Sequence, residues 1–156
     1  MTTTLEPRFE QGRIIHIAGV SCDYRGDTSA DGIPQQWEEF APHIGNIKGQ
    51  VSNATYGVCW DFGDGSSAYL CGVETEKQSD VPVGMTSVSL GPWTYAVFTH
   101  EGPVSTIRAT WSEIYDDWFP NSEKKPDGNL AYERYSDDFD PATGQGTIEI
   151  WIPVTD

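Results

Sequence analysis

Glu133 is the residue whose type and position most readily suggest chemistry. It lies within Leu130 to Tyr135, LAYERY, a short run of strand-forming and aromatic residues. A carboxylate is costly to bury unless it is paired, hydrogen-bonded or solvated. One interpretation is an anionic anchor in an aromatic pocket, where the carboxylate and the faces of aromatic rings attract an organic cation. The other is a solvent-facing carboxylate that pairs with a base on a neighbouring strand. The pattern leaves both open.

Strand geometry divides this segment into two faces. Side chains alternate along a strand, so Ala131, Glu133 and Tyr135 share one face and the residues between them share the other. Both faces mix polar and aromatic residues. Alternation therefore does not predict which face is buried.

Aromatic residues supply the remaining candidates for a binding site. Those on helical stripes, Trp37 and Trp111 among them, are explained by core packing, although a stripe position does not exclude lining a groove. Aromatics on expected strands and loops exceed what a domain of this size usually needs. The candidate ligand-binding residues are Glu133, Tyr135, Tyr56, Trp60, Tyr69, Trp93, Trp111 and Trp151.

Metal and cofactor chemistry find no support in the spacing of residues. The three histidines, at 16, 43 and 100, stand apart from one another and from the cysteines. Three cysteines without a CxxC pair favour neither a disulfide framework nor a zinc cluster. The chain has no GxSxG, GxxxxGK[ST] or GxGxxG pattern, so serine hydrolase, P-loop and Rossmann interpretations have no basis. We expect no metal and no cofactor.

The elements that must position these residues come in two similar sets. In the first half, an apolar stripe from Ile33 to Ile47 indicates a helix that starts near Pro34 and is kinked or split at Pro42. The glycines of Gly63-Asp64-Gly65 allow a tight hairpin turn. The expected strands of this half are 13–23, 55–62 and 67–76.

The second half repeats the order of strand, helix and hairpin. Its extended region, 85–100, has a bend at Gly91-Pro92, and its helix runs from Pro103 until Pro120 stops it. The expected hairpin strands are 129–136 and 146–154. We therefore predict an α+β fold, a duplicated β-α-β-β repeat, in which two pseudo-twofold-related units have antiparallel sheets, one main helix each and a groove between them. All of 1–156 forms one domain, with repeat one at about 9–76 and repeat two at about 85–154.

Composition limits the classes of partner. The 156 residues include 24 acidic and 9 basic ones, a formal net charge of −15. Such a field repels nucleic acid and either keeps the protein soluble or concentrates cations near a cleft. The chain has no long apolar run and no signal-like start. We expect a cytoplasmic protein that binds neither nucleic acid directly nor a membrane.

Several segments resemble the GyrI-like effector-binding family, which occurs at the end of AraC-type and MerR-type regulators and as free-standing proteins. The second half carries the resemblance in WTYAVFTHEGPVSTIRATWSEIYDDWFP at 93–120, LAYERY at 130–135 and IEIWIPV at 148–154. The first half is similar in TYGVCWDF and AYLCGVE. The resemblance implies the same duplicated architecture, and it implies that Glu133 lies in the groove and meets cationic or aromatic ligands. Only about eight residues precede the first strand, so we expect a stand-alone member without a helix-turn-helix domain.

Three functions follow from this resemblance. The first is binding of an amphipathic, aromatic, cationic small molecule for drug sequestration or sensing. The second is a hydrolase that opens cyclopropane rings of DNA-alkylating natural products, with Glu133 as the catalytic residue that activates water. The third is a protein interaction, with gyrase or a regulator as partner. Binding is the function we favour.

Overall fold

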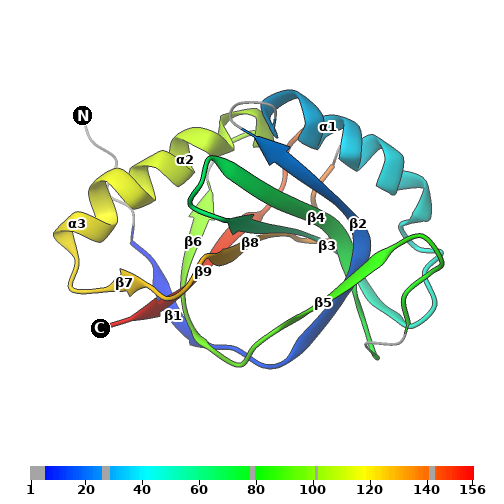
Figure 1. The fold of residues 1–156 in the computed structure, drawn as a ribbon, viewed down its shortest axis with the longest axis horizontal. Helices are drawn as coiled ribbons and strands as arrows, with labels where there is room; N and C mark the ends of the chain where they lie inside the picture. The colour runs from blue at the N-terminus through cyan, green and yellow to red at the C-terminus, as the bar shows by residue number, and fades with distance from the viewer. Residues whose placement is uncertain (1–5, 26–28, 78–79, 101, 141–142) are drawn as a thin grey trace.

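The frame of the protein is one nine-stranded, largely antiparallel sheet that curls into a half-barrel (Figure 1). The computed structural model describes residues 6–25, 29–77, 80–100, 102–140 and 143–156, without the side chains of 29–31. The strands are β1 (Arg8–Gln11), β2 (Ile15–Arg25), β3 (Gln50–Asp61), β4 (Ser66–Thr75), β5 (Thr86–Leu90), β6 (Thr94–His100), β7 (Lys125–Pro126), β8 (Leu130–Tyr135) and β9 (Ile148–Thr155).

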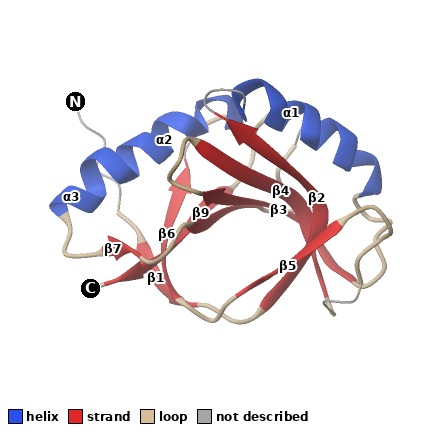
Figure 2. Cartoon of the chain, in the orientation of Figure 1, coloured by secondary structure: helices blue, strands red, loops and turns tan. Residues whose placement is uncertain are grey.

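The helical segments all lie along one face of this sheet (Figure 2). The first group is α1 (Ser29–Phe40) and the 3-10 turn η2 (Ala41–His43); the second is η3 (Val104–Thr106), α2 (Ile107–Glu113), the π-helical turn η4 (Ile114–Trp118) and α3 (Phe119–Asn121). As predicted, the first helix changes character at Pro42. The second continues one residue past Pro120 to Asn121, so this proline does not stop it as expected. Pro120 lies in the first turn of α3, directly after the π-helical turn η4, and proline is tolerated in a first turn.

Strand order explains how the two halves of the chain meet. The order is β1-β6-β9-β8-β3-β4-β2-β5, with β7 paired to β9 outside this path. The strands β6-β9-β8 come from the second half and β3-β4-β2 from the first. They join because β8 pairs with β3, where Glu133 lies opposite Gly57. The halves thus share one sheet instead of the separate sheets expected from sequence, since pairing satisfies two strand edges that would otherwise be open.

The bend predicted at Gly91-Pro92 separates β5 from β6, which pair with different strands. The sequence did not reveal β1 or β7. β1 has four exposed residues and β7 only two, so neither shows the alternating apolar pattern that marks a strand.

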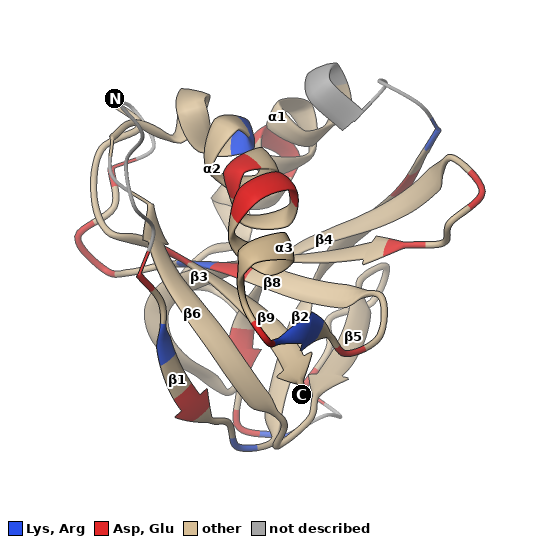
Figure 3. Cartoon of the chain, turned by 90° about the vertical axis from the view of Figure 1, so that its left-hand side faces the viewer, with Lys and Arg blue, Asp and Glu red and all other residues tan. Residues whose placement is uncertain are grey.

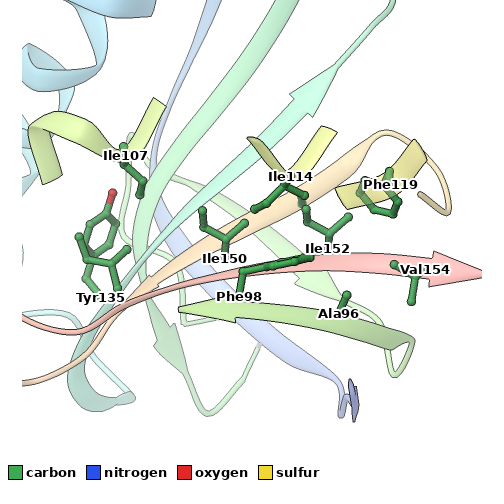
Figure 4. Packing of buried hydrophobic residues seen from close by; sticks show 11 residues of the cluster. Ala96, Phe98, Ile107, Ile114, Phe119, Tyr135, Ile150, Ile152 and Val154 are labelled. Atoms are coloured by element: carbon green, nitrogen blue, oxygen red, sulfur yellow. The ribbon is translucent and has the colours of Figure 1, made fainter. Parts of the chain in front are cut away.

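Apolar side chains fill both faces of the sheet. On the helix-covered face, β6, β8 and β9 pack against the second helical group, as Figure 4 shows. A second cluster under α1 includes Phe40, Tyr69 and Val73. On the inner side of the curl, Tyr95, Tyr132 and Trp151 lie among aliphatic residues, and the Tyr132 and Trp151 rings stack 5.5 Å apart. Within the described residues, no helix has the length and apolarity needed to cross a membrane.

Candidate functional site: a buried carboxylate beneath two helices

Glu133 lies on the helix-covered face of β8 and has only 6% of its surface exposed. It therefore does not face solvent, and the second interpretation of this residue is wrong. Alternation holds as predicted, because Ala131 and Tyr135 belong to the cluster beneath the helices, whereas Tyr132 belongs to the cluster inside the curl. Both faces of β8 are buried, which is why the sequence pattern could not distinguish them.

Three aromatic side chains donate hydrogen bonds to this carboxylate. The hydroxyls of Tyr135 and Tyr69 donate to Oε1 at 2.7 and 3.0 Å. The indole Nε1 of Trp111 donates to Oε2 at 2.8 Å. Hydrogen bonds to a charged acceptor are stronger than neutral ones, so together they offset part of the desolvation of the buried charge.

The donors come from different parts of the fold. Tyr69 belongs to β4 in the first half of the chain, whereas Tyr135 and Trp111 belong to the second half. Trp37 of α1 adds an outer layer, because its Nε1 donates to the Tyr69 hydroxyl at 3.1 Å and its ring packs edge-on against Tyr135 at 5.4 Å. Each main helix thus contributes one tryptophan above the carboxylate.

Gly57 makes room for this arrangement. A Cβ atom at position 57 would lie 1.9 Å from the hydroxyl oxygen of Tyr69 and 3.0 Å from Oε1 of Glu133. Real Cβ atoms do not approach other atoms so closely. The tyrosine can therefore lean across β3 to the carboxylate only because residue 57 has no side chain.

Burial dominates the electrostatics of the site. Desolvation raises the pKa of Glu133, while the hydrogen bonds from Tyr135, Trp111 and Tyr69 and the proximity of His100 oppose that rise. Burial, followed by the Glu133 charge, also raises the pKa of Tyr69 well above its ordinary value. The pKa of Tyr135 rises for the same two reasons. Both tyrosines therefore stay protonated near neutral pH and keep their hydroxyl hydrogens for donation.

His100 connects the end of β6 to the start of the second helical group. Its Nε2 lies 2.9 Å from the carbonyl oxygen of Pro103, which can only accept, so this nitrogen carries the proton. Its Nδ1 forms a hydrogen bond of 2.6 Å with the Thr110 hydroxyl. This buried histidine anchors α2, the helix that carries Trp111.

The structure brings four of the eight predicted ligand-binding residues together: Glu133, Tyr135, Tyr69 and Trp111. The other four lie elsewhere. Tyr56, Trp60 and Trp151 belong to the cluster inside the curl, on the opposite face of the sheet. Trp93 is 39% exposed and contacts Tyr95 at the bend between β5 and β6. Alternation along β3 places Tyr56 and Gly57 on opposite faces. Because Gly57 pairs with Glu133, this alternation would have excluded Tyr56 from the Glu133 site if the pairing of β3 with β8 had been known.

Sequence reasoning assigned no binding role to Trp37 or Gly57. Trp37 fits a packing stripe, which by itself predicts a core residue. Gly57 gave no signal by itself, because its role depends on a tyrosine from another strand.

Comparison with known proteins decides the family. Residues 5–155 match the GyrI-like small molecule binding domain. The chain belongs to this family. A curated relative, the transcriptional regulator BrlR of Pseudomonas aeruginosa, is 29% identical over 137 residues, which cover 86% of this chain and 51% of the regulator. The chain thus spans about half the length of that relative.

Solved structures show the same fold at lower identity. The structure of SAV2435 bound to tetraphenylphosphonium is 19% identical, with a TM-score of 0.76 over 96% of this chain and 94% of that one. A bacterial transcription regulation protein from Staphylococcus aureus MU50 is 18% identical, with a TM-score of 0.71 over 98% and 100%. A hydrolase from Listeria innocua is 13% identical, with a TM-score of 0.58 over 99% and 94%. The GyrI-like fold is thus common to proteins described as ligand-bound, regulatory and hydrolytic.

Proposed function

We propose that this GyrI-like domain binds an aromatic, cationic small molecule, with Glu133 as its anionic anchor and Tyr69, Tyr135, Trp37 and Trp111 around it. The observation that carries the proposal is a buried carboxylate held by aromatic donors and not by a cation. Within the described part of the chain, no ion pair involves Glu133. An organic cation would supply the missing charge and would contact the surrounding rings.

The site is closed over the carboxylate, so binding must move an aromatic side chain. Trp37 and Trp111 are only partly buried and belong to helices, whereas Tyr69 and Tyr135 belong to the sheet and are buried. We infer that the tryptophans move aside and that the tyrosines keep their places on Glu133. Binding of this kind suits sensing or sequestration of hydrophobic cations.

We also infer that the domain is a duplication. The order β6-β9-β8 in the second half matches β2-β4-β3 in the first, read from the two ends of the sheet toward the β8–β3 junction. Each half places its long helix between the first and second strands of its set. Glu133 and Gly57 lie opposite each other at this junction, so the proposed site is at the boundary between the two repeats.

A pair of probes with matched shape and opposite charge tests the anchor. Tetraphenylphosphonium and tetraphenylborate have nearly the same size and differ in the sign of their charge. We expect the phosphonium to change tryptophan fluorescence and the borate to bind far more weakly. Glu133→Gln should weaken phosphonium binding by about 30-fold or more, since losing one partner of a buried charge pair costs about 2 kcal/mol or more.

The control is a variant that makes the same charge change away from the site. Glu76→Gln, at an exposed position beyond the end of β4, lowers the overall negative charge equally. If Glu76→Gln weakens phosphonium binding as much as Glu133→Gln does, the cation responds only to the overall field and the proposed anchor is wrong.

The raised pKa of Glu133 favours a second candidate, hydrolysis of strained cyclopropane compounds. A carboxylate whose pKa lies nearer neutrality is a better general base toward water. If wild-type protein consumes such compounds over many turnovers, and Glu133→Gln abolishes turnover while an uncharged substrate still binds, the hydrolase is the better description.

A further inference from the structure

The helix-covered face of β3 extends from the Glu133 site to a second carboxylate. Gly57, Cys59 and Asp61 share this face, because side chains alternate along a strand. Glu133 lies beside Gly57, and Asp61 is the last residue of β3, where it is exposed. Four residues of extended chain span about 13 Å. We call the row of residues from Gly57 through Cys59 to Asp61 the track. Glu133 lies at its buried end and Asp61 at its exposed end.

Small side chains form the floor of this track. Cys59 pairs with Ala131 of β8, and both of these small side chains pack into the clusters beneath the helices. Burial, followed by the Glu133 charge, raises the pKa of Cys59. The Cys59 thiol therefore stays protonated and uncharged near neutral pH. The charged groups along the track are the carboxylates of Glu133 and Asp61.

Aromatic rings line the other side of the track. Tyr115 of η4 stacks on Trp111 with ring centroids 6.2 Å apart and planes 7° from parallel. Burial, and then the charges of Cys59 and Asp61, raise the pKa of Tyr115 to about 12. The ring is nonetheless 41% exposed. From Glu133 outward, a ligand would meet Trp111 first and then Tyr115.

In the part of the chain that the structure describes, neither end of the track is paired with a cation. Asp61 accepts a hydrogen bond from the backbone N–H of Gly63 at 2.9 Å, and among the described residues it forms no ion pair. Within the described ranges, the hydrogen-bond partners of Glu133 are all neutral donors. The track thus presents two anionic groups with an aromatic wall between them.

We propose that the site takes elongated aromatic dications, which place one cationic group at Glu133, their flat body against Trp111 and Tyr115, and the second cationic group at Asp61. This proposal rests on the proposed function and adds the class of ligand. A monocation would use only the buried end. Asp61 would then decide the preference between singly and doubly charged ligands without contributing to the anchor.

A pair of fluorescent dyes tests the second end. The rigid bis-amidine DAPI carries cationic groups at both ends of a flat aromatic body, and its mono-amidine analogue lacks the one on the indole. We expect DAPI to bind the wild-type protein more tightly than the analogue. Asp61→Asn should lower that ratio of affinities about three- to fivefold, the effect expected of a partly exposed charge pair.

Three variants distinguish the dication proposal from the proposal that Glu133 is the anchor. Asparagine retains an oxygen that can accept from Gly63, so Asp61→Asn should unfold at the same urea concentration as wild type. Glu76→Gln, at the other end of the β3–β4 hairpin, makes the same change in net charge and should leave the ratio nearly unchanged. Glu133→Gln should weaken both dyes.

Each remaining outcome is decisive. An unchanged ratio in Asp61→Asn, or an equal drop in Glu76→Gln, overturns the dication proposal while the Glu133 anchor stands. If Glu133→Gln leaves both dyes unaffected, the proposed function itself fails. If tetraphenylphosphonium binds and neither dye does, the track is too narrow and the dication proposal is wrong.

Discussion

At the scale of residues, the site is a carboxylate stabilised by neutral donors. Two tyrosine hydroxyls and one indole N–H contact Glu133, so its charge is spread over hydrogen bonds and not cancelled by a base. Desolvation still outweighs these bonds and raises the pKa of the carboxyl. The folded protein therefore holds a proton at this position more tightly than the unfolded chain does.

This shift predicts how stability depends on pH. Because the folded pKa lies above the unfolded value, the native state binds the extra proton, and that contribution is complete below the unfolded pKa. It is lost as the pH rises through the folded pKa. Wild-type protein should therefore gain stability relative to Glu133→Gln when the pH falls from neutral toward about 4.5. Urea unfolding of both proteins across this range measures the difference.

Comparing the two variants cancels the titration of the other acidic residues. A constant difference between wild type and Glu133→Gln over the whole range would mean that Glu133 has an ordinary pKa. A difference of the opposite sign would mean that its hydrogen bonds outweigh desolvation.

At the scale of elements, the site depends on one close approach between strands. Tyr69 of β4 reaches Glu133 of β8 by crossing Gly57 of β3, which lies between them in the sheet. Above them, His100 fixes the start of the second helical group through Pro103 and Thr110. The π-helical turn η4 then carries Tyr115 over the end of the track. π-Turns within helices often occur at functional sites, and this one borders the proposed site.

The close approach gives a test by substitution. Gly57→Ala places a methyl group where the Tyr69 hydroxyl lies, so the tyrosine must shift and its hydrogen bond to Glu133 should weaken. We expect unfolding to become easier by about 1–3 kcal/mol, the usual cost of overpacking. Phosphonium affinity should also fall. Urea unfolding and fluorescence titration measure the two effects.

A double-mutant cycle identifies the cause. In a Tyr69→Ala background, the added methyl group has nothing to displace, so Gly57→Ala should cost much less there. Equal costs in the two backgrounds would show that Gly57 matters for its backbone and not for the space that it leaves to Tyr69.

At the scale of the whole molecule, the proposed function pairs the acidic surface with the buried carboxylate. The net charge is −15, and Figure 3 shows the acidic positions spread along strands, helices and loops. Such a field attracts cations from a distance and weakens with salt, because the Debye length is about 10 Å at 0.1 M. A buried pair is screened much less.

Salt can therefore distinguish the contribution of the surface charges to affinity from the contribution of Glu133. Raising the ionic strength should weaken tetraphenylphosphonium binding to wild type and to Glu133→Gln by similar factors, which leaves the ratio of their affinities nearly constant. Titrations at low and high sodium chloride measure this ratio. A ratio that approaches one at high salt would place Glu133 among the screened surface charges.

Local periodicity was enough to predict most of the elements. The apolar stripes, the Gly63-Asp64-Gly65 turn and the bend at Gly91-Pro92 all depend on neighbours in sequence, and the turn and the bend lie where they were expected. Both helices are present with shifted ends: the first begins at Ser29 and not near Pro34, and the second continues past Pro120. β1 and β7 were missed because their residues are exposed, and such short strands are defined by pairing with distant segments.

The site itself was predicted only in part. The sequence marked Glu133 as a carboxylate among aromatics, but both faces of β8 are buried, and no local pattern shows which of them the helices cover. Alternation along β8 already placed Tyr135 beside Glu133, whereas tertiary structure alone selected Tyr69 and Trp111 as further partners. It also placed Tyr56, Trp60 and Trp151 on the other face. The physical reason is that secondary structure follows from the periodicity of nearby residues, whereas a buried carboxylate is held by donors that only the pairing of β3 with β8 and the packing of both helices bring together.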